Sequence, residues 1–551
     1  MKWDAWGDPA LAKELSADIK GLLAAALGVT GDAAPGPSAA EVVLRPSRIT
    51  ADALEALAAA VGEAHVSAAD ADRLPRAGGK STPDLLRRRS REPQDAPDAV
   101  VVPGDEAQIA AVLAVCAEHR IAVVPFGGGT SVVGGLDPER GSFEAVVSLD
   151  LRRLDRLHAL DETSGEAVLG AGLTGPAAEA LLAERGWELG HYPQSFRFAT
   201  IGGFAATRSS GQDSAGYGRF DEMVRGLRVV TPAGTLELGR GPASAAGPDL
   251  RQLFLGSEGT LGVITAVRLR IHPLPAVKAY EAWSFPDFAS GTAALRAVEQ
   301  QGTGPTVIRL SDEAETMVNL AMTEQIGGSP AVSGCLAVTV FEGDAEQVAA
   351  RHDLTREALL AAGGTSLGEA PARAWEHGRF NAPYLRDSLL NAGALCETLE
   401  TAAGWSDLPR LRTAVTEALT GALPGALVLC HISHVYPTGA SLYFTVVAAL
   451  GEDPLTRWGA AKRAAGDAII GAGGTITHHH AVGADHRPWM TDEIGDLGVR
   501  ILRAVKAELD PAGILCPWRA KRGGHMSERS ERVIRRGGRA NAPGERSEAG
   551  A

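Results

Sequence analysis

Cysteine is scarce in this chain: five of its 551 residues are cysteines, and no two of them have the Cys-x-x-Cys spacing. They are scattered along the sequence, at Cys116, Cys335, Cys396, Cys430 and Cys516. An odd number of isolated cysteines argues against a disulfide framework and against a structural zinc site, and it fits a reducing compartment. We therefore expect a cytoplasmic protein.

The sequence also lacks long apolar runs and an excess of positive charge. No stretch approaches the ~18 apolar residues of a membrane-spanning helix. The first ten residues carry Asp4 and Asp8 where a signal peptide would have a basic region and an apolar core. With 53 Lys+Arg against 67 Asp+Glu, the formal net charge is −14, which argues against a nucleic-acid partner. An anionic substrate is not excluded, because a few local arginines can bind one.

What is present is an ordinary globular composition, with 45% hydrophobic and 22% charged residues. Domains usually contain about 100–200 residues, so a chain of this length should form two packed domains with appendages. We predict a helical segment at 1–94, a first domain at 95–275, a second domain at 276–490, a helix at 491–520 that returns to the first domain, and a disordered tail at 521–551. The tail is almost free of apolar residues and cannot bury enough surface to offset chain entropy.

Strands and helices alternate from Asp98 onward. A short apolar run at 99–102 is followed by Asp105, which can cap a helix. The apolar face of that helix has the spacing i, i+3, i+4, i+7, at Ile109, Val112, Leu113 and Cys116. Residues 121–124 form the next predicted strand, so the first domain is expected to be α+β or α/β. Near the end of the chain, residues 497–509 have the pattern of an amphipathic helix.

A glycine-rich loop, Pro125-Phe-Gly-Gly-Gly-Thr-Ser-Val132, directly follows the strand at 121–124. Three successive glycines let backbone N–H groups turn toward one point with no Cβ in the way, which makes a nest for a pyrophosphate. The alternative is a glycine-rich surface turn. The loop has neither the Gly-Lys-Ser/Thr ending of a Walker A loop nor the pattern of a GxGxxG motif that opens a helix.

Three further segments place glycines and hydroxyls where a large polar cofactor could lie against bare backbone. They are Pro193-Gln-Ser195 with Thr200-Ile-Gly-Gly-Phe204, Thr207-Arg-Ser-Ser-Gly211, and Gly256-Ser-Glu-Gly-Thr-Leu-Gly-Val-Ile264. In this order and spacing, the four segments resemble the FAD domain of the vanillyl-alcohol-oxidase and para-cresol-methylhydroxylase family. The resemblance implies a two-lobed α+β fold, in which an FAD-binding domain carries an α/β cap that shapes the substrate site.

The resemblance also implies which residues hold FAD. These are Pro125, Gly127, Gly128, Gly129, Thr130, Ser131, Pro193, Ser195, Thr200, Gly202, Gly203, Thr207, Ser209, Glu258, Gly259 and Ile264. Members of the family that bond the flavin covalently often use a histidine in the glycine loop. Thr130 stands at that place here, so we expect FAD to be bound non-covalently.

Three clusters in the second domain carry the remaining chemistry. The first, Arg379-Phe-Asn-Ala-Pro-Tyr-Leu-Arg-Asp387, could equally be a surface ion pair. The second, His431-Ile-Ser-His-Val-Tyr-Pro-Thr-Gly-Ala-Ser-Leu-Tyr-Phe444, alternates like a strand. The third, Gly473-Gly-Thr-Ile-Thr-His-His-His-Ala-Val-Gly483, holds three adjacent histidines. Neighbouring residues on a strand point to opposite faces, so we do not expect the triplet to coordinate one metal ion.

These clusters resemble those of alkylglycerone-phosphate synthases. The matching positions imply proton transfer by Tyr443, His478, His479 and His480 and substrate binding by Arg386. The resemblance extends to the opening Met1-Lys-Trp-Asp-Ala-Trp-Gly7 and to Asp510-Pro-Ala-Gly-Ile514, so it covers nearly all of residues 1–520. Two departures, Ala481 and Cys516, stand where the family commonly has glycine and asparagine, which puts the exact substrate in doubt.

The family reaction exchanges the acyl group of an acyl-dihydroxyacetone phosphate for a long-chain alcohol. The flavin holds the substrate carbon at its N5 atom, and there is no net redox change. Such lipid substrates imply peripheral contact with membranes, and we also consider a homodimer. The main rival is an FAD-linked dehydrogenase or oxidase of a 2-hydroxy acid, but the comparable segment at 433–439 lacks the Gly-Asp-Gly-Asn typical of those enzymes. A flavin-binding protein without catalysis is a third interpretation.

Overall fold

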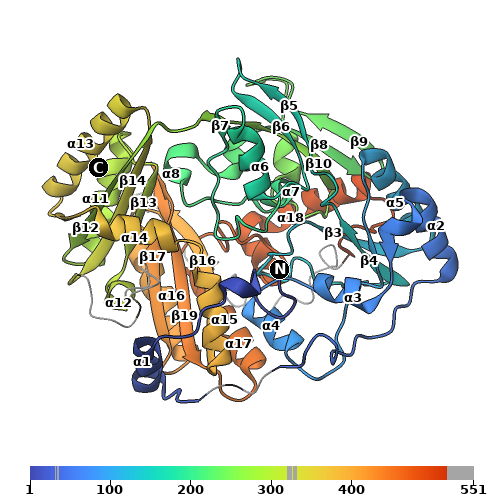
Figure 1. Cartoon of the computed structure of the whole chain (residues 1–551), viewed down its shortest axis with the longest axis horizontal. Helices are drawn as coiled ribbons and strands as arrows, with labels where there is room; N and C mark the ends of the chain where they lie inside the picture. The colour runs from blue at the N-terminus through green and yellow to red at the C-terminus, as the bar shows by residue number, and fades with distance from the viewer. Residues whose placement is uncertain (32, 34–35, 319–325, 327–331, 518–551) are drawn as a thin grey trace, which may run out of the picture.

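The computed structural model describes residues 1–31, 33, 36–318, 326 and 332–517. The tail predicted at 521–551 lies outside the described residues. Two lobes face each other in Figure 1, with the blue-to-green strands of the first lobe on the right and the yellow-to-orange sheet of the second on the left. This arrangement confirms the predicted two-lobed α+β fold. None of the described helices is long and apolar enough to cross a membrane.

The amino-terminal region is helical and irregular, as expected. Its helices are α1 (Ala17–Leu27), α2 (Ala51–Val61), α3 (Asp70–Arg73) and α4 (Thr82–Arg88), with short 3-10 turns η1 (Pro9–Leu11), η2 (Glu63–His65) and η3 (Leu74–Arg76). Helix α4 begins with a capping box, in which the Ser81 hydroxyl accepts from the Asp84 N–H and the Asp84 carboxylate accepts from the Ser81 N–H.

The first lobe contains two sheets that share one core. The first has the order β1-β2-β4-β3, with β2, β4 and β3 parallel, and the second is antiparallel with the order β5-β6-β10-β8-β9. The strands are β1 (Val66–Ser67), β2 (Ala99–Val101), β3 (Ile121–Phe126), β4 (Ala145–Asp150), β5 (Leu157–Asp161), β6 (Glu166–Gly170), β8 (Val224–Thr231), β9 (Gly234–Leu238) and β10 (Val263–Arg270). A separate two-stranded sheet pairs β7 (Trp187–Glu188) with β11 (His272–Pro273).

Helices cover these sheets where the sequence pattern predicts them. Helix α5 (Glu106–Glu118) is capped by the Asp105 carboxylate, which accepts from the Gln108 N–H at 2.8 Å, and its four predicted core residues are buried. The other helices of this lobe are α6 (Gly175–Ala183), α7 (Ile201–Thr207), α8 (Ser214–Tyr217), α9 (Phe220–Met223) and α10 (Arg251–Phe254).

The second lobe is built on an eight-stranded antiparallel sheet with the order β15-β12-β14-β13-β17-β19-β16, in which β18 pairs with β19. Its strands are β12 (Val277–Phe285), β13 (Val307–Ser311), β14 (Cys335–Gly343), β15 (Thr365–Gly368), β16 (Ala394–Gly404), β17 (Leu427–Ile432), β18 (Val435–Tyr436) and β19 (Gly439–Ala449). Its helices are α11 (Phe288–Gln301), α12 (Glu313–Met317), α13 (Ala345–Ala361), α14 (Ala370–Gly378), α15 (Ala382–Asn391), α16 (Leu408–Ala422) and α17 (Pro454–Gly471).

Period-two alternation divides this sheet into a core face and a cavity face. On β19, Leu442, Phe444 and Val446 belong to the core that α11, α16 and α17 cover. The intervening Tyr443 and Thr445 line a cavity between the lobes. Because side chains of a strand alternate between faces, the apolar packing of every second residue orients the polar ones toward the cavity.

The chain then returns to the first lobe through η5 (Arg487–Trp489) and α18 (Met490–Leu509). Lys506 donates to the carbonyl oxygens of Thr260 and Leu515, both at 2.7 Å, and Leu515 forms a bridge with Val123 of β3. The predicted amphipathic helix forms, but it has no fully buried residue, and Leu497 and Ile501 are more than half exposed. Val505 and Leu509 pack against the core of the first lobe, as the pattern predicts, while Leu497 and Ile501 of the same apolar side remain exposed.

Candidate active site

A cavity of about 390 Å³ lies between the two lobes and is lined by both. All sixteen residues predicted to hold the cofactor line it: Pro125, Gly127, Gly128, Gly129, Thr130, Ser131, Pro193, Ser195, Thr200, Gly202, Gly203, Thr207, Ser209, Glu258, Gly259 and Ile264. Of the residues predicted for chemistry, Arg386, Tyr443, His479 and His480 line the same cavity. His478 does not; it faces a separate groove beside α18.

The glycine loop lies against backbone that leaves no room for side chains. A Cβ on Gly128 would lie 2.1 Å from the Phe198 carbonyl oxygen, and one on Gly127 would lie 2.4 Å from the Thr200 hydroxyl oxygen. Gly129 has φ +72°, in the left-handed region that glycine tolerates best. The loop thus presents bare peptide groups to the cavity, which is the environment that a pyrophosphate requires.

Glu258 has a structural role in addition to its place in the cavity wall. Its carboxylate accepts from the backbone N–H groups of Val482 and Gly483, at 3.2 and 3.0 Å. The residue itself has φ +51°. Glu258 therefore ties the segment after the histidine triplet to the first lobe, a contact that the sequence does not reveal.

A buried carboxylate from β16 holds the histidine triplet in place. Glu400 accepts from the Thr477 hydroxyl at 2.6 Å and from the N–H groups of His478 and His480 at 2.6 and 2.9 Å. Burial disfavours its ionised form, but His479, His480 and these hydrogen bonds outweigh burial, so the pKa of Glu400 lies below its ordinary value. Glu400 was not among the residues predicted from the sequence.

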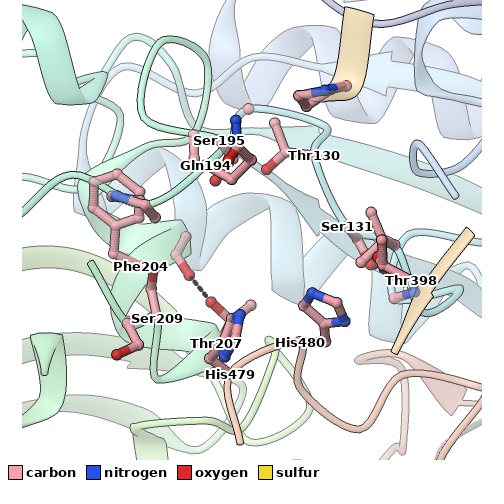
Figure 2. Close-up of a pocket in the computed structure, with 18 of the residues that line it drawn as sticks. Thr130, Ser131, Gln194, Ser195, Phe204, Thr207, Ser209, Thr398, His479 and His480 are labelled. Atoms are coloured by element: carbon pink, nitrogen blue, oxygen red, sulfur yellow. Dashed lines mark hydrogen bonds between the residues drawn. The ribbon is translucent and has the colours of Figure 1, made fainter. Parts of the chain in front are cut away.

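Two of the three histidines point into the cavity. Figure 2 shows His479 and His480 reaching in from one loop, with Thr207 and Ser209 on one side and Thr398 and Ser131 on the other. The third, His478, turns away and bonds through Nε2 to the Tyr436 hydroxyl at 2.5 Å. The triplet is therefore divided between two surfaces.

Burial determines the protonation of this cluster. Desolvation lowers the pKa of His479, opposed by Glu400, and lowers the pKa of His480 to about 3. Desolvation also raises the pKa of Tyr443 above its ordinary value. Near neutral pH, both imidazoles are thus neutral, while the Tyr443 hydroxyl retains its own proton.

His478 and His479 also approach His434, and their ligand nitrogens lie within 4.8 Å of one another. The Nδ1 atom of His434 contacts the Ser214 hydroxyl at 2.8 Å, which leaves Nε2 for another ligand. Residues 476–480 form a loop and not a strand, so the alternation of side chains expected of a strand does not apply to them. The three nitrogens form an arrangement that could hold a cation.

Comparisons with known proteins agree with this architecture. The family of FAD binding domains matches residues 97–239, and the family of FAD linked oxidases, C-terminal domain, matches residues 274–519. Alkyldihydroxyacetonephosphate synthase of Dictyostelium discoideum is 33% identical over 463 residues, which cover 80% of this chain and 76% of that protein. The chain belongs to the alkyldihydroxyacetonephosphate synthase family.

Solved structures support the same assignment. A structure of alkyldihydroxyacetonephosphate synthase superposes with a TM-score of 0.78 at 28% identity and covers 93% of this chain and 98% of that one. The structure of p-cresol methylhydroxylase superposes with a TM-score of 0.68 at 16% identity, covering 87% and 98%, which shows the shared fold. FAD is thus the cofactor, and the cradle around Gly128 fits it.

Two further arginines line the cavity besides Arg386. Arg309 on β13 donates to the Glu315 carboxylate at 2.5 Å and lies 3.1 Å from the Nε2 atom of His431. Arg379 donates to the buried Asp213 at 2.7 Å and lies over the rings of Tyr192 and Phe380. The sequence contained one signal for Arg309: a charged residue between Ile308 and Leu310 in an apolar strand.

Arg386 has protein partners for much of its guanidinium. Two of its nitrogens donate to the neighbouring Asp387, at 3.0 and 3.3 Å, and a third donates to the Lys80 carbonyl oxygen. The side chain is largely buried. Substrate binding by Arg386 stays a prediction, and the structure adds a bond to Asp387 that orients this carboxylate.

The buried His191 behind the cavity should make stability depend on pH. It packs against Phe204 and Phe220, bonds to the Ser209 hydroxyl, and has its pKa lowered to about 3 by burial. Unfolding returns this pKa to 6.5, so its contribution to stability is present above pH 6.5 and is lost as the pH falls toward 3. Between pH 7 and 5, wild type should lose about 2 kcal/mol more stability than His191→Gln.

Denaturant unfolding of both holoproteins at the two pH values measures this difference. His158→Gln is the matched control, because His158 is exposed, and it should leave the pH dependence unchanged. Equal pH dependence in wild type and His191→Gln would contradict the assignment.

Proposed function

We propose that this protein exchanges the acyl group of an acyl-dihydroxyacetone phosphate for a long-chain alcohol, as an FAD-dependent step of ether-lipid synthesis. The observation that carries the proposal is the placement of Tyr443 and His479 in the cavity that the glycine loop also lines, with their rings stacked at a centroid distance of 6.0 Å. Family membership supports the same reaction over the 2-hydroxy-acid dehydrogenase alternative.

FAD would be held by the Gly127–Ser131 loop and by the hydroxyl and glycine residues from Pro193 to Ser209. When bound, it supplies an electron-accepting ring beside the substrate carbon. Thr130 and Ser131 of the loop can form hydrogen bonds with the cofactor, and the loop contains no histidine or cysteine that could bond to it covalently. We therefore propose that FAD is bound non-covalently.

His479 and Tyr443 are the residues that we expect to act on the substrate, because His479 is neutral and Tyr443 carries a proton near neutral pH. The neutral imidazole of His479 would accept the proton that lies next to the substrate carbonyl, and the Tyr443 hydroxyl would donate a hydrogen bond to the oxygen of the departing carboxylate. Glu400 restrains the histidine loop through backbone bonds, so the imidazoles keep their position during the reaction.

The cavity wall contains both cationic and apolar side chains. Arg309, Arg379 and Arg386 supply positive charge for the substrate phosphate, of which Arg386 remains our first candidate. Aliphatic side chains line another part and suit a hydrocarbon chain: Leu385, Leu389, Leu429 and Val447. Both features fit a phosphorylated lipid better than a small hydroxy acid.

The substrate class also bears on where the protein acts and on what it contacts. We propose a cytoplasmic enzyme, which the five free, buried cysteines support. Contact with a membrane surface would deliver the lipid substrates, and we propose a homodimer as its assembly state.

Product analysis tests the proposal directly. Purified holoenzyme is incubated with palmitoyl-dihydroxyacetone phosphate and hexadecanol, and an alkyl ether is sought by mass spectrometry. The expected result is an ether product with the flavin still oxidised at the end. If no ether forms and D-lactate or glycolate bleaches the flavin anaerobically, the dehydrogenase interpretation replaces the proposal.

A further inference from the structure

The opening residues Met1–Gly7 are part of the cavity wall, although the proposed chemistry does not use them. Trp6 is 6% exposed and lines the cavity together with the glycine loop. Figure 1 places these first residues at the centre of the molecule, next to α4 and α15.

Several bonds fix this segment against the protein. The Lys2 N–H donates to the Gly7 carbonyl oxygen at 2.8 Å, which closes the segment into a loop. The Trp3 carbonyl oxygen accepts from the Lys80 ammonium at 3.1 Å and from the Arg88 guanidinium at 2.5 Å. Because the Lys80 and Arg88 side chains are both buried, the loop that they bind is a built element of the fold.

Trp6 is held on one side by the second lobe. The backbone N–H of Trp6 donates to the Asp387 carboxylate of α15 at 2.5 Å, and Arg386 orients that carboxylate at 3.0 Å. Gly7 follows with φ +68°, and a Cβ there would lie 2.2 Å from the Tyr384 hydroxyl oxygen. A side chain at this position would be strained and would meet Tyr384, so the turn that follows Trp6 depends on glycine.

On the other side, Trp6 contacts the first lobe. Its ring lies edge-on to Phe198, with centroids 5.9 Å apart and planes at 87°. Phe198 belongs to the 193–200 turn, in which the Phe198 N–H donates to the Ser195 carbonyl oxygen. The Phe198 carbonyl oxygen lies directly against Gly128. The ring of Trp6 thus supports the turn that lies on the glycine loop.

We propose that Trp6 is a positioning residue for FAD: α15 holds it through Asp387, and its ring holds the 193–200 turn against the glycine loop. This role rests on FAD binding and not on the identity of the substrate, so its test is independent of the ether-forming reaction. Loss of the ring should loosen the turn and speed the release of the cofactor.

The test measures the rate of FAD release when holoenzyme is diluted into flavin-free buffer, from the recovery of flavin fluorescence. Trp6→Ala should release FAD at least about tenfold faster than wild type, because an aromatic edge contact and its packing are lost. Trp6→Phe keeps an aromatic ring against Phe198 and should stay within about threefold.

Two variants make the result specific. Gly7→Ala leaves the Trp6 ring in place but disturbs the turn that directs it, so release should again accelerate. Trp187→Ala removes a tryptophan that packs on the core of the same lobe outside the cavity, so it should lower thermal stability without changing release. Wild-type release rates in both Trp6→Ala and Gly7→Ala, or equal acceleration in Trp187→Ala, would overturn the proposal.

Discussion

Tyr443→Phe should lower kcat for ether formation by about 10²–10⁴-fold, the usual contribution of a positioned acid or base. The substitution removes one hydroxyl and leaves the ring, which stacks on His431 at 4.9 Å and 20° and on His479 at 6.0 Å and 16°. Burial raises the pKa of this hydroxyl, so it retains its proton near neutral pH and can serve as a donor. The fold and the flavin content should remain intact, since packing is unchanged.

The measurement is the steady-state rate of ether formation at saturating substrate, with flavin content determined for each preparation. Tyr280→Phe is the matched control: it loses a hydroxyl that bonds to Glu376 at 2.7 Å, outside the cavity, and should keep most of the activity. A Tyr443→Phe enzyme with more than about half of wild-type kcat would show that this hydroxyl takes no part in the reaction.

Gly128→Ala should have the largest effect on the cofactor. The new Cβ would lie 2.1 Å from the Phe198 carbonyl oxygen and 2.7 Å from the Ala199 Cα, and backbone atoms cannot yield as a flexible side chain can. Overpacking of this kind costs about 1–3 kcal/mol, and if that cost falls on the bound state it raises the FAD dissociation constant by about 5–150-fold. Displacement of the loop also misaligns the peptide groups that face the pyrophosphate.

Flavin absorbance per protein and the dissociation constant from FAD titration test this expectation. Gly421→Ala is the control, because a Cβ at this position in α16 meets nothing within 4 Å and alanine favours the helix. It should bind FAD as wild type does. If Gly128→Ala retained wild-type affinity, the glycine loop would have no close role in cofactor binding.

The sequence predicted the cofactor side of the cavity because that side is made of local segments. The glycines of 127–129 follow a strand whose apolar run is evident, and their function depends on backbone freedom that the residue type itself provides. The helix of Ile109, Val112 and Cys116 likewise shows its buried face in its spacing. The structure of such segments depends mainly on their own residues and little on distant parts of the chain.

The catalytic side depended on contacts between residues far apart in sequence. Glu400 lies more than seventy-five residues before the histidines whose backbone it binds, and no pattern around it indicates that role. Arg309 meets His431 across two paired strands, a neighbourhood that only the sheet register creates. Helix α18 is a further example, because its apolar pattern does not reveal that Val505 and Leu509 pack on the first-lobe core while Leu497 stays exposed.

By itself, the sequence determined the family through the resemblance of its motifs, and that resemblance implied the two-lobed fold, FAD and the segments around it. Local propensity and periodicity determined individual strands and helices. Tertiary structure alone decided that His479 and His480 enter the cavity while His478 leaves it, that Glu400 restrains their loop, and that Trp6 of the opening segment joins the wall. The physical reason is that burial and long-range hydrogen bonds set side-chain direction and protonation, and both arise only when distant strands and helices pack together.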